Sequence, residues 1–197
     1  GGYVVAGIDG VELFSSLKKS CPDCQRRKKR TGETEYFHRS VVCMTVGRSP
    51  HVILGQEMLK PRDGAEKDEG ELTGGKRLIR RLKEKDRENE NWMWLVTTLE
   101  QGDHRVLWEM MNRRWDIEEN GFHQLKTYYH AKHCYCHTAT EVIFNLMIIG
   151  FNMRELYLYR RIQRFAESGI SRKSVNRKFC DELLLEKIKS VLYEKGG

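Results

Sequence analysis

Residues 113 to 126 read RRWDIEENGFHQLK and lie within a run of apolar residues spaced by three and four, from Leu107 through Trp115 and Phe122 to Tyr129. This spacing predicts one helix from about residue 103 to 129, with one buried face. Position 118 falls on that face but holds an acid, Glu118. The neighbouring Glu119 lies about 100° further round the helix and can be solvated. A carboxylate facing a core is costly unless it is paired or coordinates a metal, so Glu118 either pairs with Arg114, one turn earlier, or binds a metal ion.

The composition is that of a globular chain with a basic excess. Its 197 residues suit one domain, and the net charge is +7. No apolar run reaches the ~20 residues that span a bilayer, and the first residues show no basic region followed by a cleavage site. We therefore expect a cytoplasmic protein with no membrane contact.

Much of the positive charge lies between residues 17 and 30, where seven basic residues face a single acid, Asp23. Such a block is usually a solvated loop, but it is also how proteins contact the phosphates of DNA. We take the seven as candidate DNA-binding residues: Lys18, Lys19, Arg26, Arg27, Lys28, Lys29 and Arg30. A second basic excess, eleven Lys and Arg against six acids, lies in residues 154 to 197.

Strand-like and helix-like runs alternate in a way that predicts a mixed α/β domain. Three β-rich runs, at 3–9, 35–47 and 51–59, precede an amphipathic helix that begins near residue 76. The first of these is expected to end in a turn at Asp9-Gly10. A fourth strand candidate, WMWLVTTLE at 92–100, precedes the long helix, and further helices are expected at 141–162 and 181–195. In this layout Asp9 ends the first strand and Glu118 points from a helix toward the sheet, an arrangement suited to an oxygen-coordinated Mg²⁺.

Several motifs in residues 3 to 160 resemble those of bacterial DDE transposases of the IS4-like group. They are Asp9-Gly10 followed by Glu-Leu-Phe-Ser, a Cys-Pro-x-Cys loop, YFHRSVV, the run GELTGGKRL at 70–78, and RRWDIEENGFHQLK followed by His-x-x-His-Cys. The resemblance implies a ribonuclease H-like mixed sheet flanked by helices, over residues 1–137, with extra C-terminal helices over 138–197. It implies catalytic roles for Asp9, Glu118, Arg114 and Lys126, with Asp9 and Glu118 as ligands of Mg²⁺ or Mn²⁺. The implied partner is DNA at transposon ends, bound by a homodimer, and the implied location is the bacterial cytoplasm, in association with the nucleoid. Glu119 is an alternative to Glu118, because six residues separate it from Lys126, as is usual in the family.

The chain departs from this family between the helix near 76–86 and the strand at 92–99. A transposase of this kind carries there a further strand with the second catalytic Asp and a β-rich insertion, whereas here the segment is KEKDRENEN. The nearest acids, Asp86 and Asp103, lie in a charge run and at a helix start, so neither is assigned as the second Asp. Two functions follow as hypotheses: a truncated, weakly active or inactive DNA strand-transfer enzyme, or a catalytically dead DNA-binding remnant.

Cysteine and histidine residues offer a separate metal-binding hypothesis. Cys21 and Cys24 have the spacing of half a zinc site, and the segment HCYCH at 133–137 could supply further ligands. This is not a standard zinc-finger pattern, so we favour reduced thiols over a structural Zn²⁺. Trp115 and the segment Met147-Ile148-Ile149 are expected in the core.

Overall fold

The structure, a computed structural model, describes residues 5–47, 49–61, 68–86, 109, 112–113, 115–133, 135, 137–161 and 169–183. It is a mixed α/β fold with a small antiparallel sheet. The central strand is β3 (Thr34–Thr45), which pairs along its length with β1 (Ala6–Ser16). On its other edge β3 pairs first with β2 (Gln25–Lys28) and then with β4 (Ile53–Met58).

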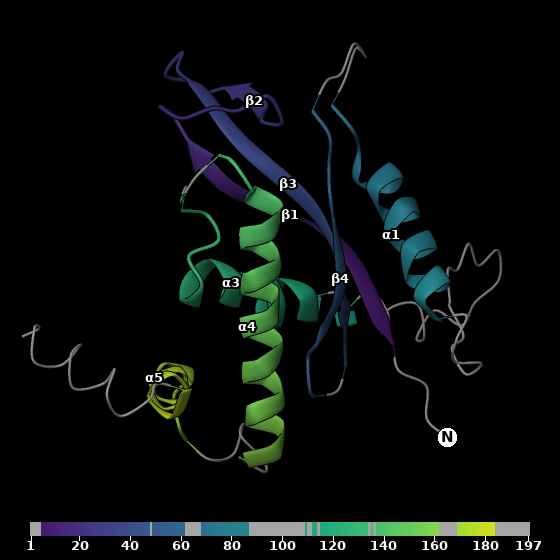
Figure 1. The fold of residues 1–197 in the computed structure, drawn as a ribbon, viewed down its shortest axis with the longest axis vertical. Coiled ribbons are helices and arrows are strands. Elements are labelled where there is room, and N and C mark those ends of the chain that lie inside the picture. Colours follow the sequence, from purple (N-terminus) through teal and green to yellow (C-terminus); the bar gives the residue numbers. More distant parts are fainter. Residues whose placement is uncertain are drawn as a thin grey trace, which may run out of the picture.

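Helices cover both faces of this sheet (Figure 1). The helix α1 (Glu71–Asp86) lies on one face. The other face carries the π-helical segment η1 (Ile117–Phe122), α3 (His123–Tyr128) and α4 (Thr140–Arg161). A last helix, α5 (Arg172–Leu183), contacts α4. In the described part of the chain, no helix combines the length and apolar character that a membrane crossing requires.

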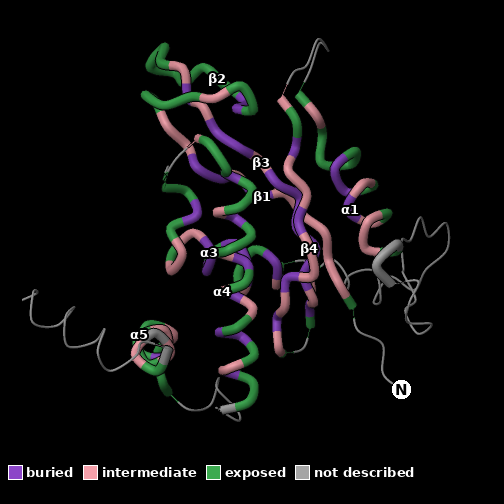
Figure 2. The backbone as a smooth tube through the Cα atoms, viewed as in Figure 1, coloured by how far each residue is buried: buried purple, intermediate pink, exposed green. Residues whose placement is uncertain are grey.

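The strand β3 is buried on both faces because helices pack on each side of it (Figure 2). Successive side chains of a strand point to opposite faces. Val42 and Met44 accordingly join the core under η1, α3 and α4, whereas Val41 and Cys43 join the smaller core under α1. The uninterrupted apolar run VVCM reflects this double burial, which removes the alternation seen in strands with one solvated face.

Two sequence expectations for the N-terminal strands are wrong. Asp9-Gly10 is not a turn, because β1 continues through it to Ser16. A Cβ atom at Gly10 would meet the carboxylate end of Glu71 at the start of α1, a half-exposed side chain that can move aside. The basic segment is not all loop either, because Gln25–Lys28 forms β2 against the first residues of β3.

The expected helix around residues 113 to 126 is interrupted by the π-helical turn, and this changes which residues are buried. Ile117 and Phe122, five positions apart, are both fully buried, so the apolar face crosses η1 with a spacing of five instead of four. Trp115 is 59% exposed, and Glu118 is exposed as well. The expectation that both lie on the buried face is therefore wrong, since it assumed a regular α-helix.

The helix α4 is fixed to the edge of the sheet by a side-chain amide. Oδ1 of Asn152 accepts a hydrogen bond from the backbone N of Ile53 at 2.8 Å, and its Nδ2 donates to the backbone O of Ile53 at 2.8 Å. These bonds satisfy backbone groups at the start of β4.

The helix α4 buries Ile148, as expected, but Ile149 is 54% exposed, against expectation, because it lies about 100° further round the helix. The strand candidate at 92–100 and most of the helix candidate at 181–195 lie outside the described residues.

Candidate metal centre and acidic residues

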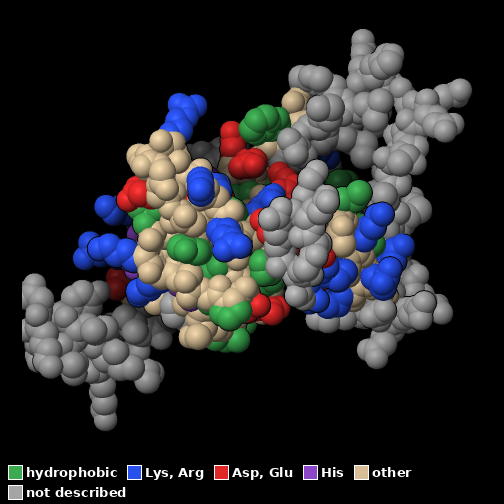
Figure 3. All heavy atoms as spheres, turned by 90° about the horizontal axis from the view of Figure 1, so that it is seen from above, with side chains coloured by type: hydrophobic (Ala, Val, Ile, Leu, Met, Phe, Trp, Pro, Cys, Tyr) green, Lys and Arg blue, Asp and Glu red, His purple; other side chains and the backbone are tan. Residues whose placement is uncertain are grey.

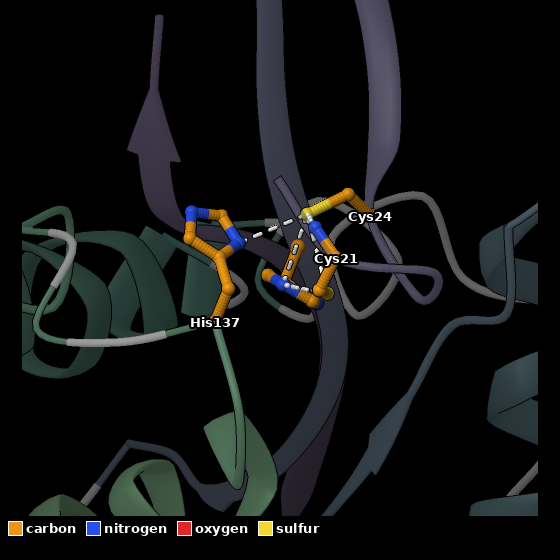
Figure 4. Close-up of side chains that lie close together, drawn as sticks. Cys21, Cys24 and His137 are labelled. Carbon is orange, nitrogen blue, oxygen red and sulfur yellow. Dashed lines mark hydrogen bonds between the residues drawn. The ribbon is translucent and has the colours of Figure 1, made fainter. Parts of the chain in front are cut away.

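Four potential metal ligands converge where the segment before β2 meets β3 and the segment between α3 and α4. Their ligand atoms, from Cys21, Cys24, His38 and His137, all lie within 4.8 Å of one another. Sγ of Cys24 is 3.4 Å from Sγ of Cys21, 3.4 Å from Nε2 of His38 and 3.0 Å from Nδ1 of His137. Sγ of Cys21 is 3.5 Å from Nε2 of His38. Figure 4 shows Cys21, Cys24 and His137 directed toward a common point.

A tight turn positions the two cysteines. The backbone N of Cys24 donates to the backbone O of Cys21 at 3.2 Å, and the backbone N of Cys21 donates to Sγ of Cys24 at 3.3 Å. The strand β2 begins at the next residue, where Gln25 pairs with Phe37 of β3. One further antiparallel step places Cys24 opposite His38, which explains why a strand residue meets the cysteine turn.

Backbone hydrogen bonds to an irregular end of β1 position the segment that carries His137. The pairing of β1 with β3 shifts register between Leu13 and Ser16, and Phe14 adopts a positive φ of 51°. The backbone N atoms of Phe14 and Ser15 consequently donate to the backbone O atoms of Ala131 and Lys132, at 3.0 and 3.2 Å. The segment after α3 is thereby held against the same end of the sheet as His38, whose pairing partner in β1 is Leu13.

The local environment favours neutral imidazoles. His38 is 2% exposed, and this burial, reinforced by the nearby His137 and opposed by Asp23, lowers its pKa. Burial and the positive charge of Lys19 lower the pKa of His137. Neutral imidazole is the form that binds metals. The Nε2 atom of His137 is buried and has no hydrogen-bond partner among the described residues.

This cluster could bind a metal ion, and its two sulfur and two nitrogen donors are those of a zinc site. Sequence reasoning identified Cys21 and Cys24, and His137 as one of several candidates. It did not identify His38. The one sequence feature that could have indicated this residue is a histidine within the strand-like run that follows the Cys-x-x-Cys turn. His133, another candidate, is exposed and packs its ring against Tyr135, while Cys134 and Cys136 lie outside the described residues.

The two proposed acidic ligands lie on neighbouring elements, Asp9 on β1 and Glu118 on η1. The segment η1 packs on the face of the sheet opposite α1. Asp9 shares its strand face with Gly7, where a Cβ atom would lie 2.5 Å from Cδ1 of Ile117. Ile117 immediately precedes Glu118, so η1 contacts β1 at Gly7, two residues before Asp9. In the described ranges, the one group of three or more closely placed His, Cys, Asp and Glu ligands is the cysteine and histidine cluster. Neither Asp9 nor Glu118 belongs to a group of this kind there.

The other proposed catalytic residues lie nearby or outside the described residues. Lys126 is half-buried in α3, with its Nζ 5.8 Å from the ring centroid of Phe122. Glu119 is exposed beside Glu118. Arg114 and Asp103 lie outside the described residues, as does the side chain of Asp86 at the end of α1.

The seven basic candidates of residues 18 to 30 are all exposed. Arg27 forms a bidentate pair with Glu12, contacts Glu35 and stacks over the Phe37 ring at 4.7 Å, and Lys29 pairs with Glu35 at 3.2 Å. Arg27 and Lys29 therefore stabilise the sheet in addition to adding positive charge to the surface. Within the described residues, no ion pair involves the other five: Lys18, Lys19, Arg26, Lys28 and Arg30. Figure 3 shows Lys and Arg side chains over several parts of the face seen from above, with acidic side chains between them.

In comparisons with known proteins, no protein-family model matches this chain, and no match was found among the curated proteins or the solved structures.

Proposed function

We propose that this chain is a DNA-binding protein of the DDE transposase type, with a ribonuclease H-like sheet. The observation that carries the proposal is the packing of η1, which bears Glu118, on the strand face that bears Asp9. The antiparallel arrangement of β1, β3 and β4, followed by α1 across the opposite face, supports the same fold.

The π-helical turn supports Glu118 over Glu119 as the acid of the motif. Seven residues separate Glu118 from Lys126, one more than the six-residue gap of the family that this chain resembles. A π-helical turn accommodates one extra residue in an otherwise α-helical segment. The longer gap between Glu118 and Lys126 is thus compatible with the three-dimensional spacing of the family.

In the proposed site, Asp9 and Glu118 would hold Mg²⁺ or Mn²⁺ through carboxylate oxygens. The ion would polarise a phosphodiester and activate the attacking water or DNA 3′-hydroxyl. Asp9 is half-buried and Glu118 is exposed, so the pair is accessible to a large substrate such as DNA. The described residues offer no third acidic ligand beside these two carboxylates, and two carboxylates alone should hold the ion weakly. We therefore expect DNA binding without detectable strand cleavage. The catalytically dead remnant is accordingly the form of this proposal that we favour.

Plasmid nicking by the purified chain in Mg²⁺ or Mn²⁺ tests the catalytic part of the proposal. The variants are Asp9→Ala and Glu118→Gln, with Glu119→Gln as the matched control one position away. Absence of nicking in all four proteins, with DNA binding retained, is the expected result. Nicking that is lost with Asp9→Ala and Glu118→Gln but kept with Glu119→Gln would show that another acid completes the site, and Asp86 would be tested first. Absence of DNA binding at low salt would contradict the proposal as a whole. Light scattering of the complex with DNA tests the proposed homodimer.

A further inference from the structure

We propose that Cys21, Cys24, His38 and His137 bind one Zn²⁺ as a four-coordinate structural centre, which fixes the basic segment 18–30 to β3 and to the segment between α3 and α4. The metal-binding part is independent of the proposed function. The effect of the ion on DNA affinity rests on that function.

The donor geometry matches a tetrahedral ion. Metal–sulfur bonds of about 2.3 Å and metal–nitrogen bonds of about 2.0 Å place tetrahedral donors roughly 3.3 to 3.8 Å apart. The four donor–donor distances given above are 3.0, 3.4, 3.4 and 3.5 Å. The remaining two pairs, Cys21–His137 and His38–His137, lie within 4.8 Å, so a shift of the His137 ring would bring all four donors to one ion.

The cluster is organised for a metal more than for a disulfide. A disulfide between Cys21 and Cys24 would use two sulfurs and leave two imidazoles converging on them without a function. The Sγ atoms are 3.4 Å apart and the two cysteines are not joined by a disulfide. Each ligand is also held by its own backbone: the cysteines by their turn, His38 by β3, and His137 by the bonds from Phe14 and Ser15. A donor set placed in this way pays little entropy when an ion binds.

A structural role follows from the number and burial of the ligands. Protein donors occupy all four positions, so no open position remains for a substrate or an activated water, as a catalytic zinc site requires. Cys24 is 9% exposed and His38 is 2% exposed, which further limits access to the ion.

The position of the centre in the sequence determines what it would hold. Lys18 and Lys19 directly precede Cys21, and β2, which contains Arg26 and Lys28, directly follows Cys24. β2 has only four residues, and among the described strands it pairs with β3 alone. A tetrahedral ion bound to Cys24, directly before the first residue of β2, would therefore fix the orientation of β2 and its exposed basic side chains relative to the rest of the sheet.

The test is the metal content of the full chain, purified in reducing buffer without chelators, by elemental mass spectrometry. About one zinc ion per chain is expected. The matched variants are His38→Ala, a ligand, and His133→Ala, an exposed histidine close to the same segment, and only the first should lose zinc. If His38→Ala does not fold, Co²⁺ substitution of the unmodified chain serves instead. A visible spectrum of tetrahedral Co²⁺ with thiolate charge-transfer bands is expected.

Folded protein without zinc that shows no such Co²⁺ spectrum, or that contains a Cys21–Cys24 disulfide under these conditions, would overturn the centre. DNA affinity is then measured before and after zinc removal and after zinc is restored. A reversible loss of several-fold is expected. Zinc binding with unchanged DNA affinity would overturn only the organising role. Zinc binding with no DNA affinity in any form would overturn the organising role and the proposed function, but not the centre.

Discussion

Sγ of Cys24 lies 3.0 Å from Nδ1 of His137, although the two residues are 113 positions apart in the sequence. The contact joins the beginning of the sheet to the connection between α3 and α4. It forms because the irregular end of β1 binds the backbone after α3. The same arrangement places exposed basic residues on both sides of the two cysteines, Lys19 before Cys21 and Arg26 after Cys24, next to the cluster.

The first prediction concerns the exposed cations of β2. Arg26 and Lys28 are two positions apart, share one side of the strand and are both exposed. Each phosphate contact releases counterions, so the double variant Arg26→Ala/Lys28→Ala should lower the salt dependence of DNA affinity by about two in the slope of log K against log salt. The control Lys76→Ala/Arg80→Ala removes the same charge from exposed positions of α1. Equal slopes for the two variants would show that the basic segment has no special role.

The second prediction concerns the thiol of Cys43, which lies in β3 under α1. Burial raises its pKa to about 12, whereas the thiolate is the reactive form. At pH 8 only about one molecule in ten thousand would carry the thiolate, by the pKa difference alone. We expect iodoacetamide to leave Cys43 unmodified in the folded chain and to modify it in urea, as followed by peptide mass spectrometry. Equal rates in both conditions would contradict the burial of this strand.

Much of the fold was predictable because apolar runs report burial directly. The runs at 35–47 and 51–59 correspond to β3 and β4, and the run at 141–162 corresponds to α4. The π-helical turn at η1 was not predictable from spacing, because a single extra residue rotates the apolar face and exposes Trp115 and Glu118. His38 was missed for a different reason. Its approach to Cys24 depends on the pairing of β2 with β3, and a strand of four mostly charged residues shows no apolar pattern.

The third prediction concerns Arg154, which is 1% exposed and links three helices. Its guanidinium donates to Gln124 of α3, to Glu155 at 2.7 Å and to Asn176 of α5 at 3.4 Å. Removing Arg154 takes away the closer partner of the buried Glu155 and leaves it only Arg172, at 3.4 Å. Arg154→Met should therefore lower the free energy of unfolding by about 3 kcal/mol. The exposed Arg160 on the same helix is the control, and Arg160→Met should change stability by less than about 0.5 kcal/mol.

A double variant shows whether the lost pairing with Glu155 is the cause. Arg154→Met/Glu155→Gln removes both charges, so its loss of stability should be smaller than the sum of the two single losses, as measured by urea unfolding. Strictly additive losses would mean that packing of the Arg154 side chain, and not its pairing with Glu155, stabilises this junction.

The fourth prediction concerns acid stability. Hydrogen bonds from Arg77, more than any other interaction, lower the pKa of Glu69 below its ordinary value of 4.5. A carboxyl group with a lowered pKa in the folded state stabilises the fold above its unfolded pKa, and this contribution is lost as the pH falls through the folded pKa. Glu69→Gln should therefore be less stable than the unmodified chain at pH 7, and the difference should shrink as the pH falls below about 4.5. Glu182→Gln, at an exposed position of α5, provides the comparison. A difference that is constant with pH would mean that Glu69 acts through its shape and not its charge.

The last prediction compares two adjacent glycines of α1. Both lie within the helix, where replacement of glycine by alanine favours the helical state by about 1 kcal/mol. At Gly75 a Cβ atom would meet only Cγ2 of Ile8, at an ordinary 3.8 Å. At Gly74 it would lie 2.3 Å from Cδ2 of Leu59 and 3.2 Å from Cγ2 of Val41, both in the core under α1. We therefore expect Gly75→Ala to raise the free energy of unfolding by about 0.5 to 1 kcal/mol. Gly74→Ala should lower it by about 1 to 3 kcal/mol, because Leu59 and α1 must move apart. Thermal unfolding of the two variants at one pH measures the difference, and since both gain the same helical propensity, that difference isolates the contact between α1 and the sheet. Equal stabilisation by both substitutions would show that α1 does not pack this closely on β3.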